Sequence, residues 1–274
     1  MTNVPPIKLN DGATMPQLGF GVWQVPDDQA AGAVKTAIAS GYRSIDTAAI
    51  YGNEEGVGRG IKTAGVARPD LFITTKLWND RQGKTEPAKA LAESLKKLKL
   101  DYVDLYLIHW PAPKQDRFVD SWRALVALQQ QGLARSIGVS NFTAAHLTRI
   151  IDATGVVPAV NQIELHPRLQ QKAMRDFHAT HGIRTESWSP LGQGKLLDDP
   201  VLAAIAKKYN KTTAQVILRW HLDNQLIAIP KSTHEARIRE NFALFDFKLE
   251  PADLAQIDKL DANGRIGPDP DRFS

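Results

Sequence analysis

The chain has 274 residues, of which 43% are hydrophobic, and it contains no run of apolar residues near the length that crosses a bilayer. It contains no cysteine, which excludes disulfide frameworks, thiolate nucleophiles and cysteine-ligated metal sites. The net charge of +4 is spread along the chain without a basic run interleaved with aromatic residues. We therefore expect a cytoplasmic globular protein, with neither nucleic acid nor membrane as a partner and a modest preference for anionic ligands.

Strand and helix patterns alternate along the chain after a hairpin that is predicted at 7–15 and turned by Asn10-Asp11-Gly12. The first strand, 18–21, precedes an alanine-rich helix at 27–40 that stops at Gly41. Seven further strands are predicted at 43–46, 71–75, 103–108, 135–139, 159–163, 183–188 and 226–229. Further helices are predicted at 53–63, at 85–98 with Thr85 as the N-cap, from 118 to before Gly132, and at 143–153. Another runs through Met174 and Phe177 and closes at Gly182, and the last four are predicted at 200–209, 212–222, 234–243 and 251–260.

Eight strands, each followed by a helix, with no linker or composition break, predict one α/β domain over 1–274. Right-handed crossovers repeated eight times close into a (β/α)₈ TIM barrel, here with an N-terminal hairpin and two extra helices. The rival is an open doubly wound sheet, which calls for a glycine-rich turn between the first strand and its helix. The nearest such run, Gly56-Val57-Gly58-Arg59-Gly60, lies inside a predicted helix, so we interpret its glycines as close helix packing.

In a parallel barrel, the C-terminal ends of all strands share one rim, where sites in this fold lie. This rim is predicted to be polar and aromatic. It would present Asp46, Lys76, His109, Ser140, Asn141, Gln162, Trp188, Lys231 and Ser232, with Trp23, Trp78 and Trp110 beside them. A ring of aromatic side chains around a few ionisable groups is typical of a pocket for a planar or carbonyl-bearing ligand.

Four of these strand-end groups suit carbonyl reduction when they are taken together. Asp46 can neutralise Lys76, and the lysine can stabilise a phenolate on Tyr51, lowering a pKa that starts near about 10. A neutral His109 can hold the substrate oxygen while Tyr51 protonates it, so the missing part is a hydride donor. Taken singly, Asp46 could cap a helix, His109 could be a core histidine and Tyr51 could pack in a turn. No histidine spacing indicates a metal site.

Two other functional classes remain open at this point. Lys76 could form a Schiff base, as in a class I aldolase. The barrel could instead bind the cofactor as a redox sensor or a partner-binding protein without turnover.

The second half of the chain offers a site for the hydride donor. Ser140, Asn141 and Gln162 carry amide and hydroxyl groups suited to a nicotinamide carboxamide, and Trp188 could stack against the ring. Lys231 and Arg237 lie on either side of a helix start, which predicts a phosphate cradle.

Longer motifs accompany these residues. They are Gly-Val-Ser-Asn at 138–141, Asn-Gln-Ile-Glu-Leu-His-Pro at 161–167 and Ile-Pro-Lys-Ser at 229–232. With Asp46, Tyr51, Lys76 and His109, they resemble the aldo-keto reductase superfamily over nearly the whole chain. Lys-Leu-Trp-Asn-Asp at 76–80, Glu-Ser-Trp-Ser-Pro-Leu at 186–191 and Gly-Pro-Asp-Pro-Asp at 267–271 are similar to the bacterial 2,5-diketo-D-gluconate reductases.

The resemblance implies a (β/α)₈ barrel that binds NADPH across its rim without a Rossmann domain. It implies Tyr51 as the general acid, tuned by Lys76 and Asp46, with His109 orienting the carbonyl. It places the carboxamide at Ser140, Asn141 and Gln162, the 2′-phosphate at Lys231, Ser232 and Arg237, and the adenine near Glu240 and Asn241. Further cofactor contacts are implied for Gly21, Trp188, Ser189, Pro190, Leu191 and Thr233, and substrate contacts for Trp23, Trp78, His109 and Trp110.

The loop at 110–115 and the C-terminal tail are both short, so we expect few residues to wall in the substrate. This predicts broad activity on small polar carbonyl compounds. We also expect the enzyme to be a monomer. The expected substrates are 2,5-diketo-D-gluconate, methylglyoxal and β-keto esters.

Overall fold

Eight parallel strands form the centre of the computed structural model, which describes residues 4–274 of the chain. Neighbouring strands are consecutive in sequence, in the order β10-β9-β8-β7-β6-β5-β4-β3. Their bounds are Phe20–Gly21 (β3), Ser44–Asp46 (β4), Phe72–Leu77 (β5), Val103–Ile108 (β6), Ala134–Ser140 (β7), Val160–Glu164 (β8), Arg184–Trp188 (β9) and Ile227–Ala228 (β10). Leu18 bridges to Ala228 in parallel, which brings the two edges of the sheet together. The predicted (β/α)₈ fold is thereby confirmed.

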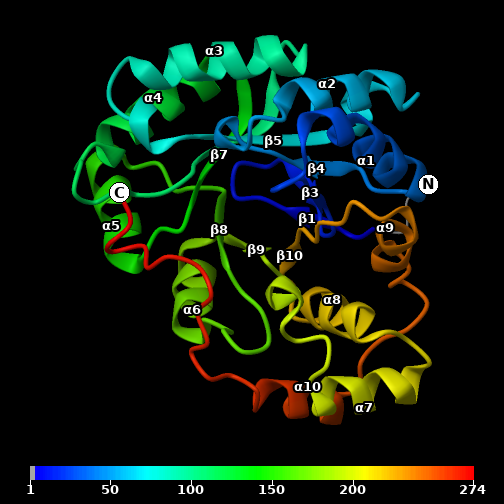
Figure 1. Cartoon of the computed structure of the whole chain (residues 1–274). Helices are drawn as coiled ribbons and strands as arrows, with labels where there is room; N and C mark the ends of the chain where they lie inside the picture. The colour runs from blue at the N-terminus through cyan, green and yellow to red at the C-terminus, as the bar shows by residue number, and fades with distance from the viewer. Residues whose placement is uncertain (1–3) are drawn as a thin grey trace.

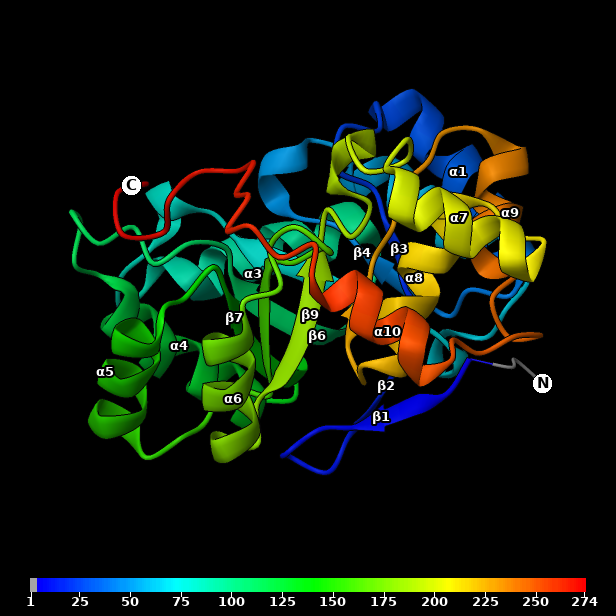
Figure 2. The ribbon, with the colours of Figure 1, turned by 90° about the horizontal axis from the view of Figure 1, so that it is seen from below.

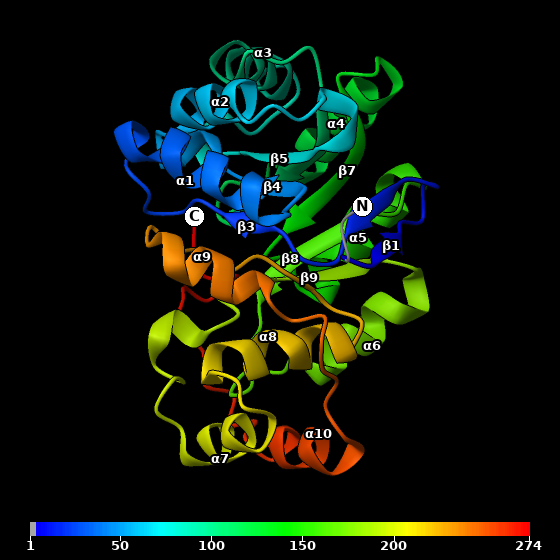
Figure 3. The same cartoon turned by 90° about the vertical axis from the view of Figure 1, so that its right-hand side faces the viewer.

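Helices surround the strands on the outside (Figure 1). The eight helices of the strand–helix repeat are α1 (Asp27–Ser40), α2 (Glu54–Thr63), α3 (Glu86–Leu98), α4 (Phe118–Gln130), α5 (Ala144–Thr154), α6 (Lys172–His181), α8 (Thr213–Asp223) and α9 (Glu235–Phe242). The two extra helices are α7 (Pro200–Tyr209) and α10 (Pro251–Asp258), which lie side by side in Figures 1 and 3. No helix within residues 4–274 is both long and apolar enough to span a membrane.

The N-terminal hairpin covers one end of the barrel. Strands β1 (Pro6–Lys8) and β2 (Thr14–Pro16) pair antiparallel, and Ile7 and Met15 pack in one apolar cluster with Leu105 and Leu107 of β6. Figure 2 shows the hairpin on one side of the barrel and the C-terminal tail crossing the other. The hairpin therefore plugs the N-terminal end of the strands and leaves the C-terminal rim to the site.

Local signals in the sequence explain several element boundaries. Helix α1 ends at Ser40 because Gly41 takes the left-handed conformation, with a φ of 115°, that stops a helix. A methyl group built on Gly60 of α2 would lie 2.8 Å from Cβ of Val34 in α1, so the close-packing interpretation of the α2 glycines is confirmed. Thr85 is the N-cap residue of α3 and Pro87 lies in its first turn, as predicted, although the Thr85 side chain makes no capping hydrogen bond.

Candidate active site

A cavity of about 950 Å³ opens at the C-terminal rim, near the upper end of the usual range for ligand pockets. All but two of the residues that the sequence places at the site line this cavity. The exceptions are Lys76, which is fully buried, and Thr233, which is exposed outside the lining. Side chains from strands far apart in sequence are therefore brought to one cavity by the closure of the barrel.

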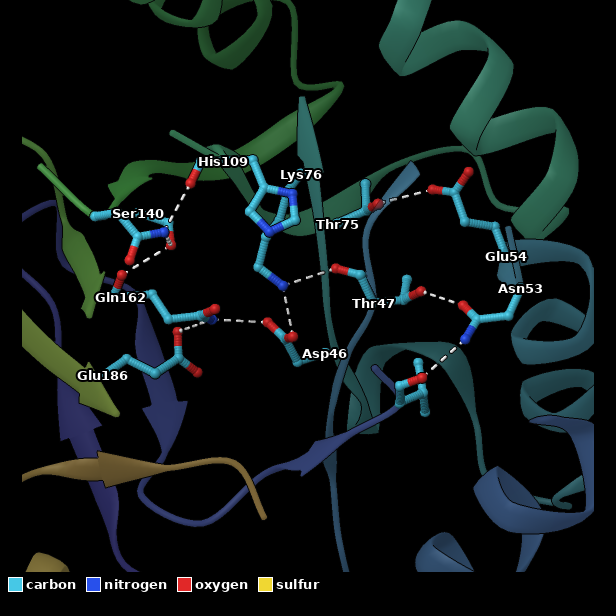
Figure 4. A network of polar contacts seen from close by, with 12 residues as sticks. Asp46, Thr47, Asn53, Glu54, Thr75, Lys76, His109, Ser140, Gln162 and Glu186 are labelled. Atoms are coloured by element: carbon cyan, nitrogen blue, oxygen red, sulfur yellow. Dashed lines mark hydrogen bonds and ion pairs between the residues drawn. The ribbon is translucent and has the colours of Figure 1, made fainter. Parts of the chain in front are cut away.

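A buried ion pair lies beneath the cavity (Figure 4). Lys76 Nζ donates to Asp46 Oδ1 at 2.5 Å and to the carbonyl oxygen of Thr47 at 2.9 Å. Strand β4 ends at Asp46, whereas Lys76 lies inside β5 rather than after it, because β5 runs two residues further than the sequence predicts. The lysine side chain therefore rises from within the barrel toward the floor of the cavity.

The environment of Lys76 keeps it protonated. Burial by itself lowers the pKa of Lys76, but the Asp46 carboxylate, with Tyr51 and Glu186, outweighs burial and the net pKa is raised. A Schiff-base lysine needs a neutral, accessible amine, and Lys76 is neither neutral nor exposed to the cavity. These features speak against the aldolase interpretation.

Tyr51 sits above the ion pair at the end of the short 3₁₀ helix Ala49–Tyr51. Lys76 Nζ lies 5.2 Å from the centroid of the Tyr51 ring. The expectation of a lowered Tyr51 pKa is wrong for the protein alone. Burial raises the pKa of Tyr51, Lys76 lowers it, and the carboxyl groups of Asp46 and Glu186 raise it again, so that the net direction is upward. Burial is the largest of these effects on the pKa, so the phenol stays protonated at neutral pH.

His109 follows β6 and meets Tyr51 edge-on, with the ring centroids 5.6 Å apart. Trp78 packs against its other side at 5.1 Å. Burial, and secondarily the charge of Lys76, lowers the pKa of His109 well below its ordinary value, so the imidazole is neutral at neutral pH as expected. A neutral imidazole offers one N–H donor, which suits it to hold a carbonyl oxygen.

Asn53 is a buried residue of this region to which the sequence patterns gave no role. Its side-chain amide donates to the carbonyl oxygens of Val22 and Val25, and its Oδ1 accepts from the Thr47 hydroxyl. Asn53 thus ties the loop after β3 to the loop that carries Tyr51.

Polar side chains follow β7 and β8 at the other wall. Asn141 Nδ2 donates to the carbonyl oxygen of His109 at 3.0 Å, and Trp188 Nε1 donates to Asn141 Oδ1 at 2.8 Å. Ser140 Oγ donates to the carbonyl oxygen of Gln162 at 2.8 Å. The bond to Asn141 fixes the Trp188 ring in the cavity lining, where a planar ligand could stack on it.

The loop from β10 to α9 supplies positive charge to the same cavity. Lys231 and Arg237 line it, and neither forms an ion pair or side-chain hydrogen bond within residues 4–274. Across the barrel closure, a Cβ atom built on Gly21 would lie 3.0 Å from the carbonyl oxygen of Ile229, so a side chain there would intrude on the cradle. Two uncommitted cations and a side-chain-free backbone fit the phosphates of a dinucleotide such as NADPH.

The C-terminal tail adds a wall that the sequence patterns did not predict. Glu164 accepts hydrogen bonds from the backbone N–H groups of Ile266 and Gly267, and this fastens the tail over the rim. Phe273 then packs on Trp110 with a centroid separation of 4.6 Å. The substrate side of the cavity is therefore more enclosed than the short tail suggested.

Comparisons with known proteins agree with this fold. The model of the aldo/keto reductase family matches residues 15–262, and the chain belongs to this family. It is 60% identical to the methylglyoxal reductase DkgA of Yersinia pestis, over 100% of this chain and 99% of that one, and 54% identical to the Escherichia coli K12 protein of the same name, with the same coverage.

Solved structures give the same result. A crystal structure of Gox0644 in the apo form superposes with a TM-score of 0.96 at 52% identity, covering 99% of both chains. A Gox0644 mutant was solved in complex with NADPH, with a TM-score of 0.96 at 51% identity and the same coverage. A Bombyx mori aldo-keto reductase bound to NADP matches with a TM-score of 0.90 at 41% identity, over 97% of this chain and 95% of that one. This chain is therefore an NADPH-dependent oxidoreductase of the aldo/keto reductase family.

Proposed function

We propose that this enzyme reduces the carbonyl group of small aldehydes and ketones to an alcohol, with Tyr51 as the general acid. The observation that carries the proposal is the buried Lys76 ammonium, paired with Asp46 and 5.2 Å from the Tyr51 ring centroid. A phenol beside a fixed cation is suited to release a proton and to remain as a stabilised phenolate.

Tyr51 and His109 have different roles in the reaction: Tyr51 donates the proton, and His109 positions the substrate oxygen. The raised pKa of Tyr51 keeps its hydroxyl group protonated until the substrate oxygen develops negative charge. The neutral imidazole of His109 donates its N–H to that oxygen and sets its position relative to Tyr51. As the Tyr51 proton moves to the oxygen, Lys76 stabilises the charge left on the phenol. When bound, NADPH supplies the hydride that the carbonyl carbon accepts.

The cofactor would be held along the second half of the rim. Ser140, Asn141 and Gln162 are the polar groups proposed for the carboxamide, with Trp188 against the ring. Lys231 and Arg237 are proposed for the 2′-phosphate, because they are the lysine and arginine side chains that line the cavity within residues 4–274. A phosphate between them would gain charge-assisted hydrogen bonds that NADH cannot make.

The substrate end of the cavity is apolar and aromatic. Trp23 and Ile50, which are 43% and 48% exposed, line it together with Trp78 and Trp110. With both cavity-lining cations assigned to the cofactor, an anionic substrate would find no partner charge there. We therefore propose neutral carbonyl compounds, methylglyoxal and β-keto esters, as better substrates than the 2,5-diketo-D-gluconate anion. The name of the DkgA relatives supports methylglyoxal.

Tyr51→Phe tests the assignment of the acid. The variant should lose reduction by at least about 10²-fold, because general acid catalysis contributes that much or more, while NADPH still quenches tryptophan fluorescence. Turnover near the wild-type rate would refute the role of Tyr51. A panel of methylglyoxal, a β-keto ester and 2,5-diketo-D-gluconate, compared by kcat/KM, tests the substrate class.

We also propose that the chain acts as a monomer with one catalytic domain over 1–274. The support for a single domain is that the family model matches residues 15–262 in one span. Sedimentation of the active enzyme at assay concentration tests this.

A further inference from the structure

Glu186 is a fully buried carboxyl group to which the proposed reaction gives no task. It lies on β9 directly across from Gln162 on β8, and its side chain points into the barrel (Figure 4). Its Oε2 accepts a hydrogen bond from Gln162 Nε2 at 2.8 Å. Its Oε1 is buried and has no partner among residues 4–274. Burying a carboxyl group with one oxygen unpaired costs free energy, which the single bond to Gln162 offsets only in part.

What Glu186 contacts is the side-chain amide of Gln162. The same Nε2 atom donates to Asp46 Oδ2, also at 2.8 Å, so the amide nitrogen bridges two carboxyl groups. An amide nitrogen has two hydrogens, and both are committed here. The Gln162 Oε1 atom has no hydrogen-bond partner in the described part of the chain, and Gln162 lines the cavity. The only polar group that Gln162 can offer a ligand is therefore an acceptor.

Two hydrogen bonds from the Gln162 nitrogen restrict the orientation of the amide more than one bond could. The bond to Asp46 sets which end of the amide faces the catalytic ion pair, but the amide plane could still turn about that single bond. The second bond, to Glu186, fixes the plane and with it the direction of Oε1. An acceptor held in one direction matches an amide N–H donor of a ligand and rejects its carbonyl oxygen.

We propose that Glu186 is a positioning residue for the cofactor: it holds the Gln162 amide so that Oε1 accepts from the NH₂ group of the nicotinamide carboxamide. This inference rests on the proposed assignment of Gln162 to the carboxamide. It adds that Gln162 acts as an acceptor only, and that the carboxyl group behind it sets the ring orientation.

The experiment compares two ligands on three proteins by quenching of tryptophan fluorescence. The ligands are NADPH and 2′-phosphoadenosine-5′-diphosphoribose, which keeps the phosphates and adenosine but lacks nicotinamide. Glu186→Met removes the acceptor in a side chain of similar length, whereas Glu186→Gln keeps an acceptor oxygen. We expect Glu186→Met to weaken NADPH binding about tenfold, the equivalent of one lost hydrogen bond, and to leave the analogue within about twofold. Glu186→Gln should bind both ligands within about twofold of wild type, because it rescues the contact.

Unchanged NADPH affinity in Glu186→Met would overturn the proposal. So would an equal loss for both ligands, which would indicate a distorted cavity and no specific effect on the nicotinamide end. If Glu186→Met does not fold, Glu186→Ala is measured with the same two ligands and must meet the same criterion.

Gln162→Ala separates this inference from the proposed function. If Gln162→Ala binds NADPH like wild type, the carboxamide assignment itself fails. If it loses affinity, adding Glu186→Met to it should cause no further loss, because the two residues act as one unit. A further tenfold loss in the double variant would show that Glu186 acts without Gln162, and would overturn the proposal.

Discussion

Raising the pH should destabilise this protein through one buried carboxyl group. Burial, followed by the Asp46 carboxylate, raises the pKa of Glu186 to about 8, against about 4.3 in an unfolded chain. Between these values the folded state keeps a proton that the unfolded chain has released. The stabilisation is therefore complete below the unfolded pKa and is lost as the pH rises through about 8.

The magnitude follows from one proton at 1.36 kcal/mol per pH unit. From pH about 6.5 to about 9, the contribution of Glu186 to the free energy of unfolding should fall by about 2 kcal/mol, which corresponds to about 4 °C in the melting midpoint of a chain of this size relative to a variant without this proton. The buried histidines His109, His146, His178 and His221 have lowered pKa values, and each gains about 0.4 kcal/mol of stability as the pH rises above about 6.5, because their unfolded forms lose their protons there. This gain is common to wild type and to a variant of Glu186, so the comparison of the two isolates the carboxyl group.

Urea unfolding at both pH values, followed by far-UV circular dichroism, measures the loss. Glu186→Gln is the matched control, because it keeps the shape and the hydrogen-bond acceptor but has no proton to release. Between the two pH values, wild type should become about 2 kcal/mol less stable relative to Glu186→Gln. If the free energies of unfolding of the two proteins change by the same amount, another group is responsible and the assignment to Glu186 is wrong.

Three other substitutions test separate parts of the site. Arg237→Ala should weaken NADPH about tenfold or more and NADH by less than about threefold, as measured by fluorescence titration, because the arginine is assigned to the extra phosphate; equal losses would place that phosphate elsewhere. His109→Gln should lower kcat/KM about 10²-fold and change the ratio between a matched aldehyde and ketone, with NADPH affinity kept; an unchanged ratio would contradict its role at the carbonyl oxygen. Asn53→Ala should reduce the free energy of unfolding by about 2 kcal/mol in urea, because hydrogen bonds to Thr47, Val22 and Val25 are lost together; a change below about 0.5 kcal/mol would show that the Tyr51 loop is held by other contacts.

Local sequence patterns predict much of the architecture. Helix α1 spans Asp27–Ser40 as predicted, because an apolar stripe ends at a glycine that can take a positive φ. Strand β6 spans Val103–Ile108 as predicted, because a mostly apolar run suits a strand covered on both faces. Since the C-terminal ends of parallel strands share one rim, the order of residues along the chain is also enough to assign Asp46 and His109 to one site.

Other features depend on contacts that no local pattern encodes. Glu186 reads in sequence as one polar residue in a strand, and only the pairing of β8 with β9 sets it against Gln162. The predicted direction of the Tyr51 pKa is wrong, because charge signs can be read from sequence but the depth of burial that outweighs them cannot. The packing of Phe273 on Trp110 likewise depends on the attachment of the C-terminal tail to Glu164 across the rim. The sequence by itself determined the elements, the order of the strands and the residue types at the rim. Desolvation and long-range pairing, which exist only in the closed barrel, decided their protonation and orientation.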